Sequence, residues 1–111
     1  MRIGIFTDTY LPDINGVASS SHILRNELVK HGHDVLVVTT EIKKGTEYID
    51  DDNVYRLSGI ELKNLYDYRL SSFFSLKAMA KIKAMDLDVI HVQTEFSIGI
   101  FGKIVAHLLN I

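Results

Sequence analysis

Three short segments of the chain are rich in β-branched residues and apolar on both faces, which constrains the fold more than any other feature. They are residues 3–7, 35–39 and 89–92. Strands of this kind are covered on both sides, as in a parallel sheet with helices above and below. A fourth segment, residues 54–57, predicts a more exposed strand. The pattern predicts an α/β protein with an open parallel sheet.

The segment between the first two strands predicts an amphipathic helix over residues 17–31. Gly32 follows it as a stop residue suited to the left-handed region. Strand, helix and strand then form a right-handed crossover unit of about 40 residues. The residues expected on one side of this helix are Val17, Leu24, Leu28 and His31.

The rest of the chain predicts two more helices and one long loop. Residues 73–85 have helix-forming composition, and residues 98–109 form a helix that is apolar on nearly every side. Residues 40–53 are polar and include Asp50, Asp51 and Asp52, which favours a solvated loop. We expect strand order 3-2-1-4, helices on both faces, and one partial domain over residues 1–111. A helix that is apolar all round is normally covered all round, so we expect the domain to be truncated.

Composition narrows the class of protein. A chain of 111 residues with 47% hydrophobic content makes one domain at most and has enough apolar side chains for a core. Its net charge of -2 argues against nucleic-acid binding. No signal peptide, cysteine or apolar run of about 18 residues is present, which predicts a cytoplasmic protein. His31 and His33 are spaced like a metal pair but have no third ligand nearby, so we expect neither metal nor cofactor.

The candidate site follows from the topology. Ligands of open α/β sheets bind beyond the carboxyl ends of the strands, where the strand order reverses. Two loops would face each other there, residues 8–16 and residues 93–97. Gly16 stands at the start of a helix, where a backbone without a Cβ suits a phosphate group, although a turn could equally require it. Neither a dinucleotide fingerprint nor a P-loop is present.

The second loop offers amide, hydroxyl and carboxylate groups suited to sugar hydroxyls. The alternative is that Thr94 or Ser97 caps the last helix, with Glu95 near the helix N-terminus. Two histidines lie near this site. His22 could face the crevice or pack, and we expect His91 to be buried and hydrogen-bonded.

Residues 63–86 differ in charge from the rest of the chain. This segment carries five Lys or Arg against two Asp, a net +3 within a chain at -2, so the remainder stands at -5. Aromatic residues interleave with the basic ones, as in a helix that lies on a membrane surface. An ordinary helix with a solvated lysine edge is the alternative.

Four segments together resemble the N-terminal domain of family 4 glycosyltransferases, and within it the bacterial diacylglycerol glucosyltransferases. They are RIGIFTDTYLP at residues 2–12, NGVAS at 15–19, GHDV at 32–35 and DVIHVQTEF at 88–96. The resemblance implies the truncated N-terminal half of a GT-B fold with Rossmann-like domains. It also implies a retaining enzyme that moves a hexose, expected to be glucose from UDP-glucose, to a lipid such as diacylglycerol.

The resemblance also assigns roles to residues. Asn15, Gly16 and Val17 would approach the donor diphosphate, although many members carry two glycines where this chain has Asn15 and Gly16. The principal catalytic groups would lie beyond Ile111, so this chain alone should be inactive. Self-association through the last helix is the alternative to truncation as an explanation of its apolar surface. The residues expected to form the acceptor-side wall are Asp8, Tyr10, Gln93, Thr94 and Glu95, and those expected to contact an anionic membrane are Arg69, Phe73, Phe74, Lys77 and Lys81.

Two alternatives remain. A relative with a soluble sugar or protein acceptor would use residues 63–86 as an ordinary packed segment. A stand-alone binding module of receiver type would need an acidic cluster after the first strand, where Asp8 fits weakly. A flavodoxin would need a Ser/Thr-rich phosphate loop there, which Tyr10, Leu11 and Pro12 do not provide.

Overall fold

The computed structural model describes residues 1–43, 45–50, 53–57, 59–61, 69–71, 76–94 and 96–111. Its elements are β1 (Arg2–Phe6), α1 (Gly16–Lys30), β2 (Asp34–Thr40), β3 (Val54–Leu57), β4 (Gly59–Glu61), β5 (Arg69–Ser71), α2 (Leu76–Ala84), β6 (Val89–Val92) and α3 (Ser97–Leu109).

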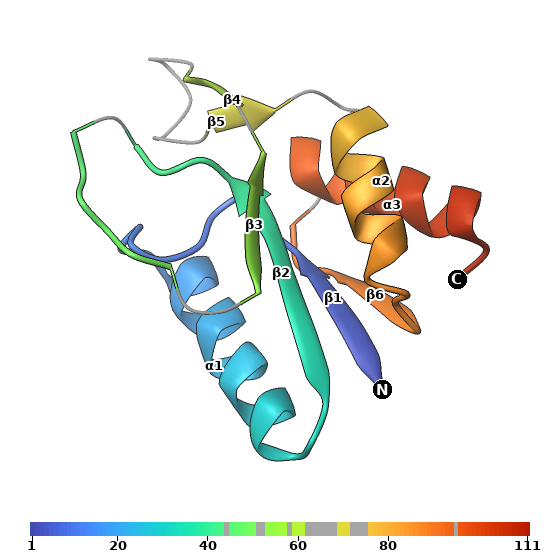
Figure 1. Cartoon of the computed structure of the whole chain (residues 1–111). Coiled ribbons are helices and arrows are strands. Elements are labelled where there is room, and N and C mark those ends of the chain that lie inside the picture. The colour runs from blue at the N-terminus through green and yellow to red at the C-terminus, as the bar shows by residue number, and fades with distance from the viewer. Residues whose placement is uncertain (44, 51–52, 58, 62–68, 72–75, 95) are drawn as a thin grey trace.

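The main sheet has four strands in the order β3-β2-β1-β6, and all its pairs are parallel (Figure 1). This confirms the predicted order 3-2-1-4, in which the last strand lies beside the first on the side away from the second. β4 and β5 form a separate antiparallel pair that was not predicted. Each has three residues, which is too short for hydrophobic periodicity to indicate a strand.

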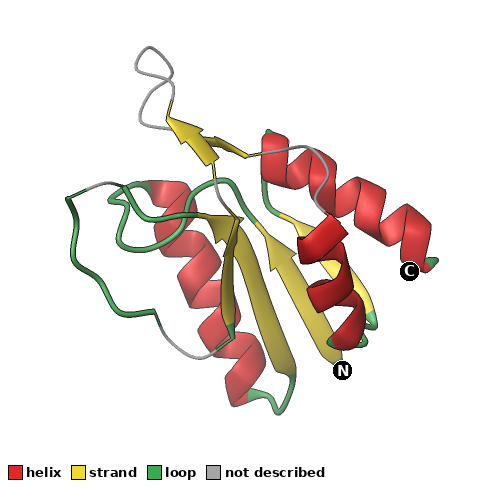
Figure 2. Ribbon diagram, turned by 45° about the horizontal axis from the view of Figure 1, so that its top comes forward, coloured by secondary structure: helices red, strands yellow, loops and turns green. Residues whose placement is uncertain are grey.

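The strands are covered on both faces, as predicted. α1 lies on one face of the sheet, and α2 and α3 lie on the other (Figures 1 and 2). Side chains of consecutive strand residues point to opposite faces, so β1 and β2 contribute to two cores. The core on the α1 side contains Ile5, Val35 and Val37 with Leu24 and Leu28. The core on the α2 and α3 side contains Phe6, Leu36 and Val38 with Ile82, Ile98, Phe101 and Val105.

Local chemistry fixes both ends of α1. The Asn15 side chain accepts a hydrogen bond from the Ala18 N–H at 2.8 Å and caps the first turn. Gly32, with φ of 87°, ends the helix as predicted. His31 is not on the packed side, which corrects the expectation: the helix ends at Lys30, and the His31 side chain is 73% exposed.

α3 packs through small residues. Its buried residues are Ser97, Ile98, Gly99, Phe101, Gly102 and Val105. A Cβ added at Gly99 would lie 1.7 Å from the Thr94 carbonyl oxygen, so the first turn of α3 touches the preceding loop. The outward face leaves Ile100 38% and Leu108 56% exposed, so α3 is covered on one side only in the described structure. Among the described helices, none has the length and hydropathy to cross a membrane.

Candidate functional site

The loops after β1 and β6 meet at the carboxyl edge of the sheet. The Asp8 N–H donates to the Thr94 hydroxyl oxygen at 2.8 Å, and that hydroxyl donates to the Asp8 carboxylate. The structure therefore brings together the two loops that the predicted strand order places at the candidate site. β6 continues the same contact through the Gln93 N–H, which donates to the Phe6 carbonyl oxygen at 2.9 Å.

The Asp8 carboxylate caps α3 from outside the helix. Oδ1 accepts a hydrogen bond from the Ile98 N–H at 2.7 Å and another from the Ser97 hydroxyl at 3.1 Å, and Asp8 is only 1% exposed. The alternative that Thr94 or Ser97 caps the helix is wrong: the N-cap residue is Phe96, no side chain caps it locally, and both hydroxyl groups donate to Asp8. Sequence reasoning missed this cap. The available signal was an acidic residue placed to meet the positive end of a helix across the strand-order switch.

The loop after β1 (residues 7–15) is folded onto itself and onto α1. The Thr9 hydroxyl donates to the Asp13 carboxylate at 2.9 Å and accepts from the Asn15 side-chain amide at 2.9 Å. The Asp13 N–H donates to the Tyr10 carbonyl oxygen at 3.0 Å. These bonds join the loop to the N-cap residue of α1, so the loop and the helix start are positioned together.

Gly16 has no structural reason to be a glycine. Apart from its chain neighbours and its own helix, no heavy atom of the described residues lies within 4 Å of a Cβ added there, and Gly16 is exposed. Its φ is not positive either, since the glycines in the left-handed region are Gly32 and Gly45. The turn interpretation of Gly16 therefore finds no support. The open space lies directly over the N-terminus of α1, which carries partial positive charge. Val17 follows it and is half-buried.

Tyr10, in this loop, is buried against His22 of α1, which is half-buried. Tyr10 is 2% exposed and belongs to the core on the α1 side. Its hydroxyl lies 3.0 Å from His22 Nδ1, and His22 Nε2 lies 3.2 Å from the Asn26 side-chain nitrogen. Of the two roles left open for His22, the structure favours packing.

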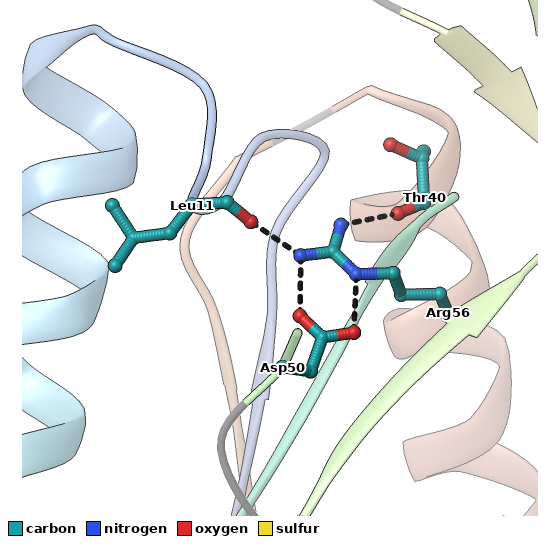
Figure 3. Close-up of polar contacts among 4 residues, drawn as sticks. All are labelled: Leu11, Thr40, Asp50 and Arg56. Atoms are coloured by element: carbon teal, nitrogen blue, oxygen red, sulfur yellow. Dashed lines mark hydrogen bonds and ion pairs between the residues drawn. The ribbon is translucent and has the colours of Figure 1, made fainter. Parts of the chain in front are cut away.

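Arg56 connects three segments at this edge (Figure 3). Its Nε and Nη2 each donate to the Asp50 carboxylate at 2.8 Å, and Nη1 donates to the Thr40 carbonyl oxygen at 2.8 Å. Nη2 also donates to the Leu11 carbonyl oxygen. The described residues 41–43 and 45–50 form a largely exposed loop, as predicted, but Asp50 is an exception, because its side chain is 25% exposed and paired with Arg56.

The remaining acceptor-side residues are less enclosed. Gln93 is half-buried, and its Oε1 lies 2.7 Å from His91 Nε2. His91 is exposed, which contradicts the predicted burial, whereas the predicted hydrogen bond is present. In the sheet that the structure describes, β6 lies at one end of the strand order, and the described members of the α1-side core include no residue of β6. Glu95 lies outside the described residues.

The residues predicted to contact a membrane are divided between elements. Arg69 lies in β5, and Lys77 and Lys81 lie in α2. Lys81 is exposed, with its Nζ 5.5 Å from the centroid of the Tyr55 ring. Phe73 and Phe74 lie outside the described residues. Over the described part of the chain, no three His, Cys, Asp or Glu side chains are grouped to hold a metal ion.

Comparison with known proteins decides the family. The family model of Glycosyltransferase Family 4 matches residues 14–111. The chain belongs to glycosyltransferase family 4. It is 41% identical over its whole length to an alpha-monoglucosyldiacylglycerol synthase of Streptococcus pneumoniae, of which it covers 25%. It is also 41% identical over 108 residues, 96% of its length, to the alpha-monoglucosyldiacylglycerol synthase of Acholeplasma laidlawii, of which it covers 27%.

The name of a more distant relative gives a different sugar donor. The chain is 24% identical over 118 aligned residues to a GDP-mannose-dependent alpha-mannosyltransferase of Mycolicibacterium smegmatis; the match spans all of this chain and 30% of that protein. The family 4 chain thus spans about a quarter of the length of the curated relatives it matches.

Proposed function

We propose that this chain is the N-terminal, acceptor-side part of a longer retaining glycosyltransferase. The complete enzyme moves a hexose, expected to be glucose from UDP-glucose, to a membrane lipid such as diacylglycerol. Family membership supports the transferase activity. The two relatives at 41% identity support the lipid, because both are named as synthases of a glucosylated diacylglycerol. The match to longer glycosyltransferases argues against a stand-alone flavodoxin or receiver module.

The open start of α1 is the observation that supports a donor site in this chain. Asn15, Gly16 and Val17 form it, and neither packing nor backbone conformation requires the glycine. A diphosphate would approach the backbone at Gly16 and would be stabilised by the helix N-terminus. The nucleotide itself would be held by the part of the enzyme that follows this chain.

The acceptor-side wall is proposed to run from Asp8 and Tyr10 to Gln93, Thr94 and Glu95. Asp8 and Tyr10 are buried and hydrogen-bonded, so they would shape the wall from behind. Gln93 is half-buried and would be the amide group offered to a hydroxyl of the acceptor. A proton at the reacting hydroxyl would be handled by groups outside this chain.

Location and assembly complete the proposal. The enzyme would work at the cytoplasmic face of an anionic membrane, with α2 and the adjacent basic residues near the lipid. The outward face of α3, with Ile100 and Leu108 exposed, would be covered in the complete enzyme or by self-association.

The test is transfer by the complete enzyme and its Gly16→Val and Gly16→Ala variants. Diacylglycerol in mixed micelles is the acceptor, and UDP-glucose and GDP-mannose are compared as donors. We expect transfer from UDP-glucose and a loss of about 100-fold or more in Gly16→Val, at an unchanged melting temperature, because the side chain fills the diphosphate space. Gly16→Ala should lose less. Near-normal transfer by Gly16→Val would remove Gly16 from the site, and transfer only to soluble sugars would overturn the lipid acceptor.

A further inference from the structure

Arg56 joins segments that are far apart in the chain. It extends from β3 across the carboxyl end of β2 to the middle of the loop after β1, where it reaches the Leu11 carbonyl oxygen (Figure 3). On the way it bonds to Thr40, the last residue of β2, and is held by Asp50. Only 10% of the Arg56 side chain is exposed. Its guanidinium is therefore a fixed part of the carboxyl edge and not a mobile surface group.

The geometry of these contacts requires an arginine. Two neighbouring nitrogens, Nε and Nη2, engage both oxygens of Asp50, while Nη1 and Nη2 reach two separate backbone carbonyls. A guanidinium provides five N–H donors in one plane, whereas a lysine provides three donors on a single atom. A lysine at position 56 would retain the charge but could not make this set of bonds.

The contact with Leu11 falls between two independently fixed points of the loop. At the near end, Asp8 is bonded to Thr94 and to the start of α3. At the far end, Asn15 caps α1 and bonds to Thr9. Arg56 holds Leu11 in the stretch between them. The path of the loop is therefore set by this guanidinium together with the bonds among Thr9, Tyr10 and Asp13.

Stability alone does not account for this arrangement. A largely buried ion pair contributes little net stability, because the cost of removing both charges from water offsets their attraction. What a bidentate pair does provide is a defined orientation. Asp50 fixes the plane of the guanidinium, and the guanidinium fixes the position of the Leu11 carbonyl group.

We propose that Arg56 is a positioning residue for the transfer reaction, and this rests on the proposed function. It touches neither donor nor acceptor. It holds Leu11, the neighbour of the wall residue Tyr10, while the donor end of the same loop is fixed separately through Asn15. Loss of the clamp therefore displaces the acceptor without displacing the diphosphate. A displaced wall holds the acceptor less tightly, and a misplacement of about 1 Å lowers kcat/KM by up to about 100-fold.

The experiment compares the complete enzyme with its Arg56→Lys and Asp50→Asn variants. Arg56→Lys retains the charge and removes the planar fork; Asp50→Asn retains the shape and weakens the clamp. Arg2→Lys is the matched control, because Arg2 is also a strand arginine but lies at the amino end of β1, away from the carboxyl ends of the strands. It lies 3.9 Å from Asp34 and 3.7 Å from Asp86, with 52% of its side chain exposed.

We expect kcat/KM for the lipid acceptor to fall about 10- to 100-fold in Arg56→Lys, mainly through a higher acceptor KM. The donor KM should stay within about twofold, Asp50→Asn should show the same split with a smaller loss, and Arg2→Lys should match the wild type.

Three results would overturn the inference. Equal losses for donor and acceptor that follow a lower melting temperature would make Arg56 a structural residue. Wild-type kinetics in both Arg56→Lys and Asp50→Asn would leave it without a role. If Arg56→Lys does not fold, Asp50→Asn decides by the same criteria. A wild-type enzyme without any transfer activity would overturn the proposed function as well, so the two failures are distinguishable.

Discussion

The carboxylate of Asp8 accepts a hydrogen bond at 2.7 Å from the backbone N–H of Ile98, 90 residues later in the chain. The first turn of α3 is therefore capped by a side chain from the loop after β1. The N-cap residue of α3, Phe96, has no side-chain group for that bond. This one carboxylate joins β1, the loop after β6 and α3 at the point where the strand order reverses.

Removing this carboxylate should destabilise the protein markedly. We expect Asp8→Ala to lower the free energy of unfolding by about 3 kcal/mol, because buried donors of Ile98 and Ser97 lose a charged acceptor. Asp88→Ala is the control: the Asp88 carboxylate also accepts from a backbone N–H, that of Arg2 at 2.7 Å, but it is exposed. Its loss should be about 1 kcal/mol or less. Equal losses in urea unfolding would contradict the role given to Asp8.

Gly99 and Gly16 should respond oppositely to the same added methyl group. A Cβ at Gly99 would lie 1.7 Å from the Thr94 carbonyl oxygen, so Gly99→Ala forces α3 away from the loop after β6. We expect a loss of about 2–3 kcal/mol or more. Gly16→Ala meets nothing within 4 Å and should leave stability unchanged or slightly higher. Melting temperatures of the two variants test this, and similar values would show that α3 is not packed so closely.

Two neighbouring threonines of β2 provide a second pair of substitutions that should change stability in opposite directions. The Thr39 hydroxyl is buried without a hydrogen-bond partner in the described part of the chain, whereas the Thr40 hydroxyl donates to the Asp8 carbonyl oxygen at 3.3 Å. Thr39→Val replaces an unsatisfied polar group by a methyl group of similar shape and should stabilise by about 1 kcal/mol. Thr40→Val breaks a buried bond and should destabilise by a similar amount. A Thr39→Val variant less stable than the wild type would indicate a partner for that hydroxyl.

The sequence predicted the main sheet because its signals are local. Strands that are apolar on both faces can be recognised within a few residues, and Gly32 ends α1 through its own backbone conformation. The order of the strands then followed from the handedness and length of the crossovers. The two loops at the carboxyl edge followed from that order without further information.

The contacts within the site could not be predicted in the same way. Asp8 acts on residues 86 to 90 positions away, and no local pattern reports such a partner. Asp50 begins a run of three aspartates, a pattern typical of a solvated loop, so its pairing was not predicted. The available signal was Arg56, because an arginine in a half-buried strand requires an acidic partner. His91 was misjudged because a central strand and an edge strand share one hydrophobic pattern, and only the sheet order distinguishes them.

The basic segment at residues 63–86, which contains α2, leads to the last prediction. Within a chain at -2, the segment that contains α2 carries +3, so its charge is a local feature. Each Lys or Arg near an anionic bilayer contributes about 1 kcal/mol, and the effect fades within a Debye length. We expect the complete enzyme to sediment with anionic vesicles at low salt, to bind neutral vesicles weakly, and to lose binding about 10-fold or more when Arg69, Lys77 and Lys81 are changed together to Glu.

The structure supplies a control for this measurement on the opposite face of the sheet. Lys30 ends α1 with 74% of its side chain exposed, and its only pairing in the described structure is a surface contact with Glu27 at 3.5 Å. Lys30→Glu and Lys81→Glu therefore change the charge equally, on helices that cover different faces (Figure 1). If α2 faces the lipid, Lys81→Glu weakens sedimentation and Lys30→Glu leaves it unchanged. Equal effects would show that net charge alone drives binding, and no effect of the triple change would leave α2 as a helix that only covers the sheet.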